Sequence, residues 1–260
     1  MNEKAQTHHA AQAEISKSKP ELNAPASIKG IYLLPNLFTT AGLFAGFYSI
    51  VSAMQHKFEL ACITILIAMI ADGLDGRVAR LTNTQSEFGA EYDSLSDMVA
   101  FGLAPALLIY SWSLHHLGKL GWLIAFFYVA CTGLRLARFN TQSEDADKRY
   151  YKGIACTAAA GVLASVVWYL LTWGLTDGGK PLAIVMAVFM VLIAALQVSN
   201  VKFYSFKTFG LKGVVPFMFL VLFVIALIAL VFDPPRVLFF AFIAYLILGP
   251  IIAWRVTRKD

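Results

Sequence analysis

Long apolar stretches separated by short polar gaps make up the chain from about residue 31 onward. Each stretch is close to the roughly 20 residues that a helix needs to cross the hydrocarbon core of a bilayer. The stretches are continuously apolar rather than alternating, which favours helices over the strands of a membrane barrel. The pattern predicts eight spans, at 31–54, 59–81, 90–112, 120–139, 153–174, 180–198, 213–232 and 236–256.

The composition is typical of a protein whose solvent is lipid. Of the 260 residues, 58% are hydrophobic and 14% are charged, whereas a soluble domain is about 25% charged. The mean hydropathy is +0.67. This composition excludes a disordered chain, a small disulfide-rich domain and a nucleic-acid-binding arm. We therefore predict an all-α integral membrane protein, a polytopic helical bundle with no nucleic-acid partner.

Lysine and arginine residues fall mainly on one side of the predicted membrane. Eight spans place both termini on the same side, and only four of the 21 basic residues lie on the opposite side (Lys57, Lys119, Lys180 and Arg236). The remaining 17 share the side of the termini, and a seven-span interpretation would break this separation. Because basic loops stay in the cytoplasm, we predict that both termini face it across the cytoplasmic (inner) membrane.

Two groups of residues with ligand-forming side chains are interpreted as structural or solvated. Cys62, Cys131 and Cys156 lie in or beside apolar spans, and their spacing matches no metal site, so we expect small buried hydrophobic side chains there. His115 and His116 fall in a gap on the side away from the termini, where we expect them to be solvated.

Acidic residues concentrate at the end of the second predicted span and the start of the third. Six of the 16 acidic residues lie between positions 72 and 97. Asp72 and Asp75 are three residues apart, and Asp93 and Asp97 are four apart, so each pair occupies one helix face. A short turn makes the two helices antiparallel neighbours whose acidic faces oppose each other. Carboxylates at membrane depth are costly and mark a functional site by default.

The residue types in this acidic cluster point to hard divalent cations. Four carboxylates facing one cavity repel each other unless cations lie between them, and oxygen ligands without His or thiolate suit Mg, Mn or Ca. Two metals bridged by shared aspartates would suit phosphoryl-type chemistry. The alternative is a polar network that only holds the helices together. Small residues among the acids allow close helix approach or admit a ligand, and Arg80 is placed to contact a phosphate.

The stretch from residue 72 to residue 97 reads DGLDGRVARLTNTQSEFGAEYDSLSD. It resembles the signature of the CDP-alcohol phosphotransferase family, D-x2-D-G-x2-A-R-x8-G-x3-D-x3-D, at every fixed position. The matching residues are Asp72, Asp75, Gly76, Ala79, Arg80, Gly89, Asp93 and Asp97. The resemblance implies a six-helix membrane core, a CDP-linked lipid substrate, two divalent ions (Mg or Mn) and a homodimer.

The same resemblance implies a role for each matching residue. Asp72, Asp75 and Asp93 would hold one metal ion, and Asp72, Asp93 and Asp97 the second. Asp97 would also be the catalytic proton acceptor beside Asp93. The CDP part of the lipid would be surrounded by residues of the first span and of the motif, namely Asn36, Thr39, Thr40, Gly76, Ala79, Arg80, Ser86 and Gly89.

Three further segments narrow the resemblance to the bacterial phosphatidylserine synthases of this family. They read LPNLFTTAG at 34–42, GLRLARFN at 133–140 and QVSNVKFYSFK at 197–207. One segment departs from the pattern, because 153–161 reads GIACTAAAG where a proline-containing run is expected. The domains implied are a disordered or surface-lying tail at 1–29, a catalytic membrane domain at 30–210 and two additional transmembrane helices at 211–260.

The activity implied is transfer of the phosphatidyl group of CDP-diacylglycerol to the hydroxyl of L-serine, by direct displacement, since no covalent nucleophile stands out. The serine carboxylate calls for a cation, and the candidates for serine binding are Arg135, Arg138, Asn140 and Lys202. The alternative for each cation is an anchor at a helix end. Alternative functions are a transferase of the same family that takes glycerol 3-phosphate or inositol, an ion-coupled transporter, and a structural membrane protein without catalysis.

Overall fold

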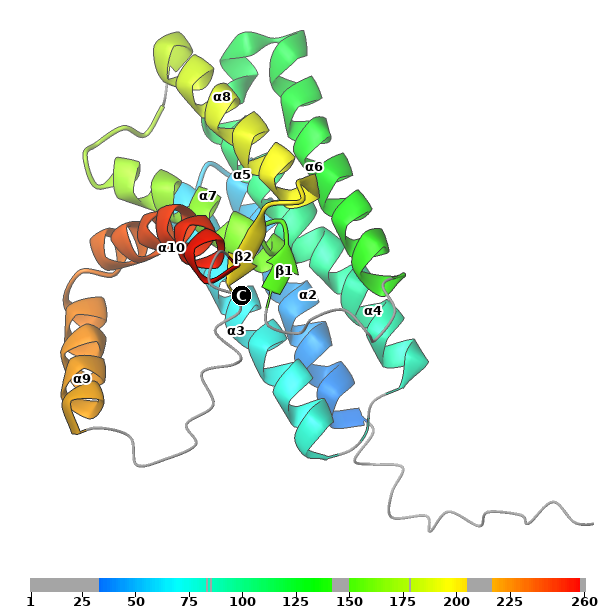
Figure 1. Cartoon of the computed structure of the whole chain (residues 1–260). Helices are drawn as coiled ribbons and strands as arrows, with labels where there is room; N and C mark the ends of the chain where they lie inside the picture. Colours follow the sequence, from blue (N-terminus) through cyan, green and yellow to red (C-terminus); the bar gives the residue numbers. More distant parts are fainter. Residues whose placement is uncertain are drawn as a thin grey trace, which may run out of the picture.

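The computed structural model describes residues 33–82, 84, 86–141, 150–177, 179–204 and 217–257. Helices run side by side in a bundle, with a small pair of strands beside the C-terminal end of α8 (Figure 1). The predicted tail at 1–29 lies outside the described residues. The elements in chain order are α2 (Leu33–Met54), α3 (Phe58–Leu81), α4 (Glu87–Asp97), η2 (Met98–Leu103), α5 (Ala104–Trp112), η3 (Leu114–Leu117), α6 (Lys119–Asn140), β1 (Tyr150–Lys152), α7 (Cys156–Leu171), α8 (Gly179–Val198), β2 (Lys202–Tyr204), α9 (Phe217–Phe232) and α10 (Pro234–Thr257).

Each of the eight predicted spans contains one helical segment of the described chain. Five segments are long and apolar enough to cross a membrane, namely Leu34–Met54, Glu87–Trp112, Lys119–Asn140, Gly179–Val198 and Pro234–Ile252. The segments in α7 and α9 are shorter, and α3 carries several charged residues in its second half. The chain is thus a multi-pass helical membrane protein, as predicted, while the count of eight crossings stays a prediction.

Small residues of α2 set its distance from the elements that carry or follow the acidic motif. A Cβ atom on Gly46 of α2 would lie 2.6 Å from the Cα atom of Ala100 in η2, which is closer than packed atoms approach. A Cβ atom on Gly42 would be in ordinary contact with Ala71 of α3, at 3.6 Å. Gly46 therefore lets α2 lie directly against the third predicted span, just beyond Asp97.

The third predicted span is not a uniform α-helix. Its middle, η2, is a π-helical turn that starts directly after Asp97. Pro105 follows as the second residue of α5 and has no N–H to donate to the carbonyl of Phe101, four residues earlier. The Tyr128 hydroxyl of α6 donates to that carbonyl instead, at 3.0 Å. A wide turn at this point is typical of functional sites, because it redirects the neighbouring side chains.

Two short strands, absent from the sequence prediction, connect distant parts of the chain. β1 pairs with β2 in antiparallel register, with Tyr151 opposite Phe203. β1 ends directly before the predicted fifth span, and within that span α7 begins at Cys156, three residues later than predicted. Gly153 has a φ of 77°, and its N–H donates to the carbonyl of Val201 at 2.8 Å. This link fixes the start of α7 against the end of α8.

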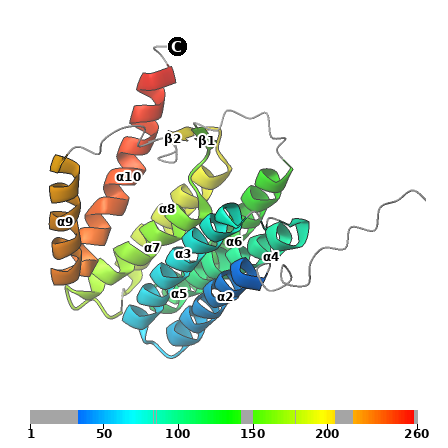
Figure 2. The ribbon, with the colours of Figure 1, turned by 90° about the horizontal axis from the view of Figure 1, so that it is seen from below.

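The last two helices lie at one edge of the bundle. α10 runs along α7, while α9 lies on the outside next to α10 (Figure 2). The rings of Tyr169 and Phe239 stack with centroids 4.3 Å apart, and a Cβ atom on Gly161 would lie 2.5 Å from the ring of Phe242. α10 is thus packed closely on α7, whereas α9 exposes most of its large apolar side chains.

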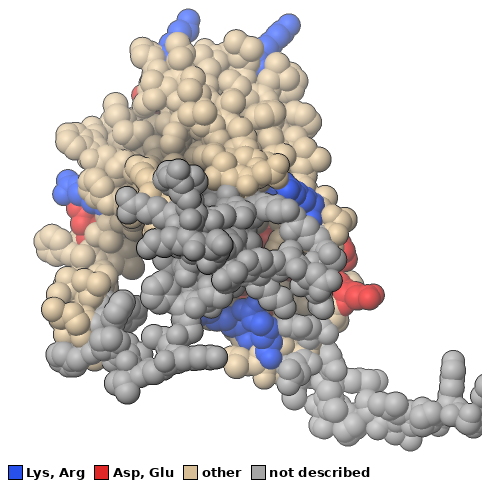
Figure 3. Space-filling model, viewed as in Figure 1, with Lys and Arg blue, Asp and Glu red and all other residues tan. Residues whose placement is uncertain are grey.

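Charged side chains are sparse over much of the surface. In Figure 3 the upper body of the molecule is almost free of them, except for basic side chains at its top edge. Large apolar side chains are exposed on several helices, for example Phe47, Ile70 and Phe126. This surface is the one expected where lipid tails, not water, cover the protein.

Candidate active site

The turn between α3 and α4 brings the two halves of the acidic motif together. Ser86 is the N-cap of α4, and its hydroxyl accepts a hydrogen bond from the Gly89 N–H at 3.0 Å. Thr82 ends α3 with a hydroxyl bond to the carbonyl of Val78 at 2.7 Å. These caps stop one helix and start the next within a few residues. Asp72 and Asp75 of α3 consequently face Asp93 and Asp97 of α4.

Three of the aspartates form a compact group of potential metal ligands. One carboxylate oxygen from each of Asp72, Asp75 and Asp93 lies within 4.8 Å of the others. All four motif aspartates line one small cavity between α2, α3, α4 and η2. Carboxylates this close repel each other in a poorly hydrated site, and a hard divalent cation relieves that repulsion. The donor set therefore fits a divalent cation, as the sequence pattern suggests.

Asp75 is the most enclosed member of this group. The residue is only 5% exposed, and its Oδ2 accepts a hydrogen bond from the Thr39 hydroxyl of α2 at 2.9 Å. The carbonyl of Thr39 in turn accepts from the Ser96 hydroxyl of α4 at 3.1 Å. Thr39 thus links the first span to both acidic helices and orients a candidate metal ligand.

Asp97 has a partner that the sequence reasoning did not assign to it. The thiol of Cys156, at the N-terminus of α7, donates to the Asp97 carboxylate with 3.7 Å between Sγ and Oδ2. Cys156 is buried, as expected from the sequence, but it also contacts the motif. The only sequence signal was its place in the segment 153–161, where the chain departs from the family pattern.

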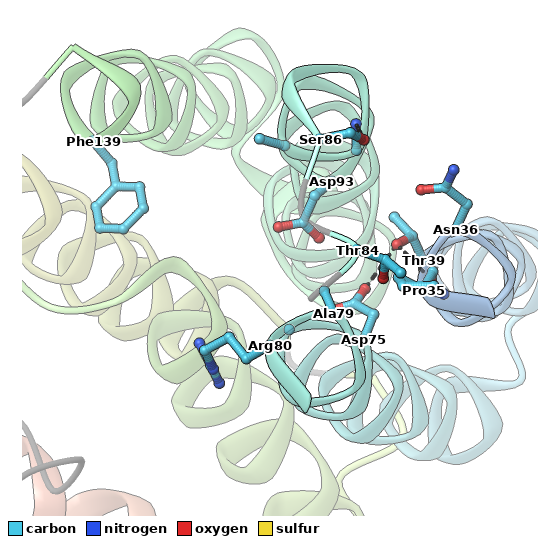
Figure 4. A pocket seen from close by; sticks show the side chains of 13 residues that line it. Pro35, Asn36, Thr39, Asp75, Ala79, Arg80, Thr84, Ser86, Asp93 and Phe139 are labelled. Atoms are coloured by element: carbon cyan, nitrogen blue, oxygen red, sulfur yellow. Dashed lines mark hydrogen bonds between the residues drawn. The ribbon is translucent and has the colours of Figure 1, made fainter. Parts of the chain in front are cut away.

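A larger pocket of about 380 Å³ opens beside the acidic cavity. Figure 4 shows Asp75 of α3 and Asp93 of α4 facing each other across it, with Thr39 beside Asp75. Arg80 and Phe139 lie on the other side of the opening. The pocket is lined by Pro35, Asn36, Thr39, Asp75, Gly76, Ala79, Arg80, Thr84, Ser86, Gly89, Ala90, Asp93 and Phe139.

Seven of the eight residues expected around the CDP group line this pocket. Thr40 is the exception, because its hydroxyl donates to the carbonyl of Asn36 at 2.7 Å and lies 2.9 Å from the Tyr92 hydroxyl. Gly89 keeps the wall open, since a Cβ atom there would come within 3.1 Å of Ser86 Oγ and 3.5 Å of Asn36 Oδ1. Pro35, Thr84, Ala90 and Phe139 were not expected, because no spacing rule connects them with the motif.

The candidates for serine binding lie at the ends of α6 and α8. Arg135 donates to the carbonyl of Gln197 at 3.3 Å, and Arg138 donates to the carbonyl of Val198 at 3.3 Å and to Asn200 Oδ1 at 2.8 Å. Both arginines therefore bind the C-terminal carbonyls of α8, which is a structural role. Asn140 donates to the Ser94 hydroxyl of α4 at 3.0 Å.

The candidates for serine binding differ in how the described contacts connect them with the acidic cavity. Arg135 lies near Cys156, the residue that contacts Asp97, and its guanidinium is within electrostatic reach of that thiol. Lys202 belongs to β2, opposite Lys152, and its side chain lies outside the described atoms. Arg135 is thus the candidate cation that the described contacts connect with the acidic cavity.

Comparison with known proteins agrees with this arrangement. Residues 32–199 match the model of the CDP-alcohol phosphatidyltransferase family. A CDP-diacylglycerol–serine O-phosphatidyltransferase of Helicobacter pylori is 36% identical over 229 residues, which cover 87% of this chain and 93% of that protein. Proteins of the same name are 36% identical over 173 residues in Mycobacterium bovis, covering 58% of this chain and 60% of that protein, and 35% identical over 155 residues in Saccharomyces cerevisiae, covering 54% and 55%.

The family match spans α2 to α8, so it includes the acidic motif, the pocket beside it and both arginines of α6. The relative from Helicobacter pylori extends the similarity over most of the remaining chain. The chain belongs to the CDP-alcohol phosphatidyltransferase family.

Proposed function

We propose that the protein transfers the phosphatidyl group of CDP-diacylglycerol to the hydroxyl of L-serine, releasing CMP. The observation that carries this proposal is the meeting of Asp72, Asp75 and Asp93 beside a pocket of about 380 Å³. Such a pocket suits a nucleotide head group. The curated relatives named above carry this activity in their names. The multi-pass membrane setting suits a substrate with two acyl chains.

Divalent metal ions, Mg or Mn, are part of the proposal. Asp72, Asp75 and Asp93 would hold one ion, and Asp72, Asp93 and Asp97 a second, consistent with the shared cavity of the four side chains. When bound, such ions supply positive charge that offsets the charge of a diphosphate and of the departing CMP. Removal of divalent ions with a chelator is expected to abolish turnover, and Mg or Mn is expected to restore it.

The pocket residues would hold the CDP group. Asn36 and Ser86 lie together at one wall and offer an amide and a hydroxyl for hydrogen bonds. Arg80, at the other side of the opening, offers a guanidinium for a phosphate group. Gly76, Ala79 and Gly89 leave space for the head group, while the acyl chains stay in lipid.

The reaction would be a single displacement at phosphorus. Asp97 takes the proton of the serine hydroxyl as the oxygen attacks the phosphorus atom next to the diacylglycerol. The bond from that phosphorus to the oxygen shared with CMP breaks, and CMP leaves with the electron pair. The Cys156 thiol holds the Asp97 carboxylate from the side of α7, which fixes the direction in which the base points.

Arg135 would bind the serine carboxylate. The Arg135 guanidinium lies near Cys156, and the Cys156 thiol contacts Asp97. A serine whose carboxylate is bound by Arg135 would therefore have its hydroxyl close to Asp97. The rest of the serine-binding site would be formed by Arg138, Asn140 and Lys202. Arg135→Lys is expected to raise the KM for serine while leaving the KM for CDP-diacylglycerol unchanged, because a single ammonium group replaces the guanidinium fork. Equal changes in both KM values would contradict this assignment.

The decisive experiment measures CMP release by purified protein with CDP-diacylglycerol and a panel of alcohols. We expect serine to be the acceptor, and release with glycerol 3-phosphate or inositol alone would replace serine by that alcohol. Asp97→Asn is expected to lower turnover by about 10²–10⁴-fold while the donor still binds. Asp177→Asn, on the connection between α7 and α8, is the matched control with normal turnover. Normal activity of Asp97→Asn would refute its role as the base.

The proposal includes an orientation and an oligomeric state. Both termini and the active site would face the cytoplasm across the cytoplasmic (inner) membrane, because 17 of the 21 basic residues lie on that side in the eight-span arrangement. Cysteine labelling of each connection in intact cells tests the orientation. The family resemblance also supports a homodimer, and the mass of the detergent-solubilised protein tests it.

A further inference from the structure

A second group of ligand-forming side chains lies at the end of the bundle opposite the aspartates. His115 and His116 belong to η3, the turn between α5 and α6, and Asp177 belongs to the connection between α7 and α8. One ligand atom from each residue lies within 4.8 Å of the others. The sequence predicted two solvated histidines here, but the fold adds a carboxylate from 61 residues away.

Hydrogen bonds already orient this group. His116 Nε2 lies 2.6 Å from Asp177 Oδ1, and the same oxygen accepts from the Gly179 N–H at 3.4 Å. His115 Nδ1 lies 3.4 Å from the carbonyl of Tyr110, which can only accept. A proton on Nδ1 leaves the lone pair of His115 on Nε2. A histidine that donates one ring nitrogen to a carbonyl and offers the other is the usual arrangement of a metal ligand.

The surroundings suit a cation that enters from water. The His116 side chain is 26% exposed and that of Asp177 is 66% exposed. The hydrogen bond from His116 lowers the pKa of Asp177, so this carboxylate is ionised at neutral pH. The two imidazole rings have centroids 4.0 Å apart. The two rings therefore lie close enough for each to offer a nitrogen atom to one ion.

We propose that His115, His116 and Asp177 form a binding site for a zinc-type transition metal ion. Two imidazole nitrogens and one carboxylate oxygen are ligands that Zn²⁺ accepts, with a fourth position left for water. Zn–ligand distances of about 2.0–2.2 Å put neighbouring ligand atoms about 3.4 Å apart, so small side-chain rotations from the present separations complete the site. The bound ion would join the α5–α6 connection to the α7–α8 connection.

This site differs in chemistry from the acidic cavity. Imidazole nitrogen selects zinc-type ions over Mg²⁺, whereas the four aspartates offer only hard oxygen ligands. Among the described residues, the connection between α7 and α8 is held by a bond from the Trp112 indole N–H to the carbonyl of Leu175 at 3.0 Å and by the bond between His116 and Asp177. Zinc would add a further link at the same place, so its expected effect is on stability and not on the reaction.

The test measures zinc uptake by the purified full-length protein in detergent, with Mg²⁺ in excess to occupy the aspartates. We expect one equivalent of Zn²⁺ to bind at micromolar concentration and to raise the Tm. His116→Gln and Asp177→Asn are expected to lose this equivalent and the rise in Tm. His116→Cys is expected to retain zinc, because a thiolate replaces one ligand by another, while it removes the ion pair with Asp177.

The matched control is His56→Gln. His56 is an exposed histidine on the turn between α2 and α3, in an edge-to-face contact with Phe58, and is expected to keep the bound zinc. CMP release in Mg²⁺ is expected to be the same for wild type, His116→Gln and His56→Gln. Equal zinc uptake by wild type and His116→Gln, or no uptake by wild type, would overturn the proposal, and loss of zinc in His116→Cys would reduce the cluster to an ion pair.

Discussion

The two ends of the bundle both gather ionisable side chains from separate elements, but they do so in opposite ways. At one end Asp72, Asp75 and Asp93 lie on helices that small residues bring into close contact. At the other end His116 and Asp177 lie on connections and meet at the surface. The first group is fixed by helix packing, and the second by two turns that happen to be neighbours. Chemistry that needs exact placement is therefore expected at the first end.

The comparison also concerns what surrounds each group. The aspartates are supported by Thr39 of α2, by Cys156 of α7 and by the π-helical turn after Asp97. Four predictions test whether the end with the aspartates supports catalysis while the opposite end of the bundle contributes only to stability.

Among these four variants, the largest effect is expected from Asp93→Asn. Asp93 belongs to the ligand group and lines both the acidic cavity and the larger pocket. Loss of one carboxylate is expected to weaken Mn²⁺ binding and to lower CMP release by about 10²–10³-fold, because charge stabilisation of the leaving group is lost. Glu91→Gln, two residues earlier and exposed, is expected to behave as wild type. Equal losses in the two variants would show that the face of α4 does not matter.

Gly46→Ala is expected to have the next largest effect. Its Cβ atom would lie 2.6 Å from the Cα of Ala100, so α2 and η2 would have to separate at the level of the aspartates. The free energy of unfolding is expected to fall by about 1–3 kcal/mol, and CMP release should fall as well. Gly73→Ala is the matched control, because nothing lies within 4 Å of its Cβ position. Thermal unfolding in detergent and CMP release measure both effects, and a neutral Gly46→Ala would contradict the close approach.

Tyr128→Phe is expected to cost about 1 kcal/mol of unfolding free energy, the usual net value of one hydrogen bond. The variant removes the hydroxyl that donates to the carbonyl of Phe101, which Pro105 leaves without its helical donor. Because the turn begins next to Asp97, kcat is expected to fall while Mn²⁺ binding is kept. Tyr48→Phe, an exposed tyrosine on α2, serves as the control in the same unfolding and turnover assays. If Tyr48→Phe lost more unfolding free energy or kcat than Tyr128→Phe, the π-helical turn would have no specific role in the active site.

The smallest effect is expected from Arg236→Gln. Arg236 pairs with Asp233 at the start of α10, with 2.9 Å between Nη1 and Oδ2, and the arginine side chain is 59% exposed. Exposed ion pairs contribute about 0–1 kcal/mol and are screened by salt. A small decrease in Tm that disappears at high salt, with unchanged CMP release, is expected. A loss of CMP release would contradict this expectation and show that the start of α10 affects the active site.

Much of the fold could be predicted because lipid imposes a simple rule on sequence. Runs of about 20 apolar residues gave the positions of the helical segments to within a few residues. Such runs do not predict the strand pair of β1 and β2, because three-residue strands carry no periodicity. They also do not predict the π-helical turn, which depends on Pro105 and on a hydroxyl donated by another helix.

Some features of the candidate site could likewise be predicted from the sequence, and others could not. The spacing of Asp72, Asp75, Asp93 and Asp97 placed four carboxylates around one turn, since helical geometry converts spacings of three and four into faces. No spacing connects Asp97 with Cys156, or His116 with Asp177, because these pairs are 59 and 61 residues apart.

The amino-acid sequence by itself determined the membrane class, the positions of the helices and the acidic motif, because each depends on local pattern alone. Only the tertiary structure decided which partners complete each cluster. Thr39 and Cys156 reach the aspartates from α2 and α7, and Asp177 reaches the histidines from another connection. The physical reason is that helix faces follow from residue spacing, whereas contacts between distant segments follow from how the helices pack.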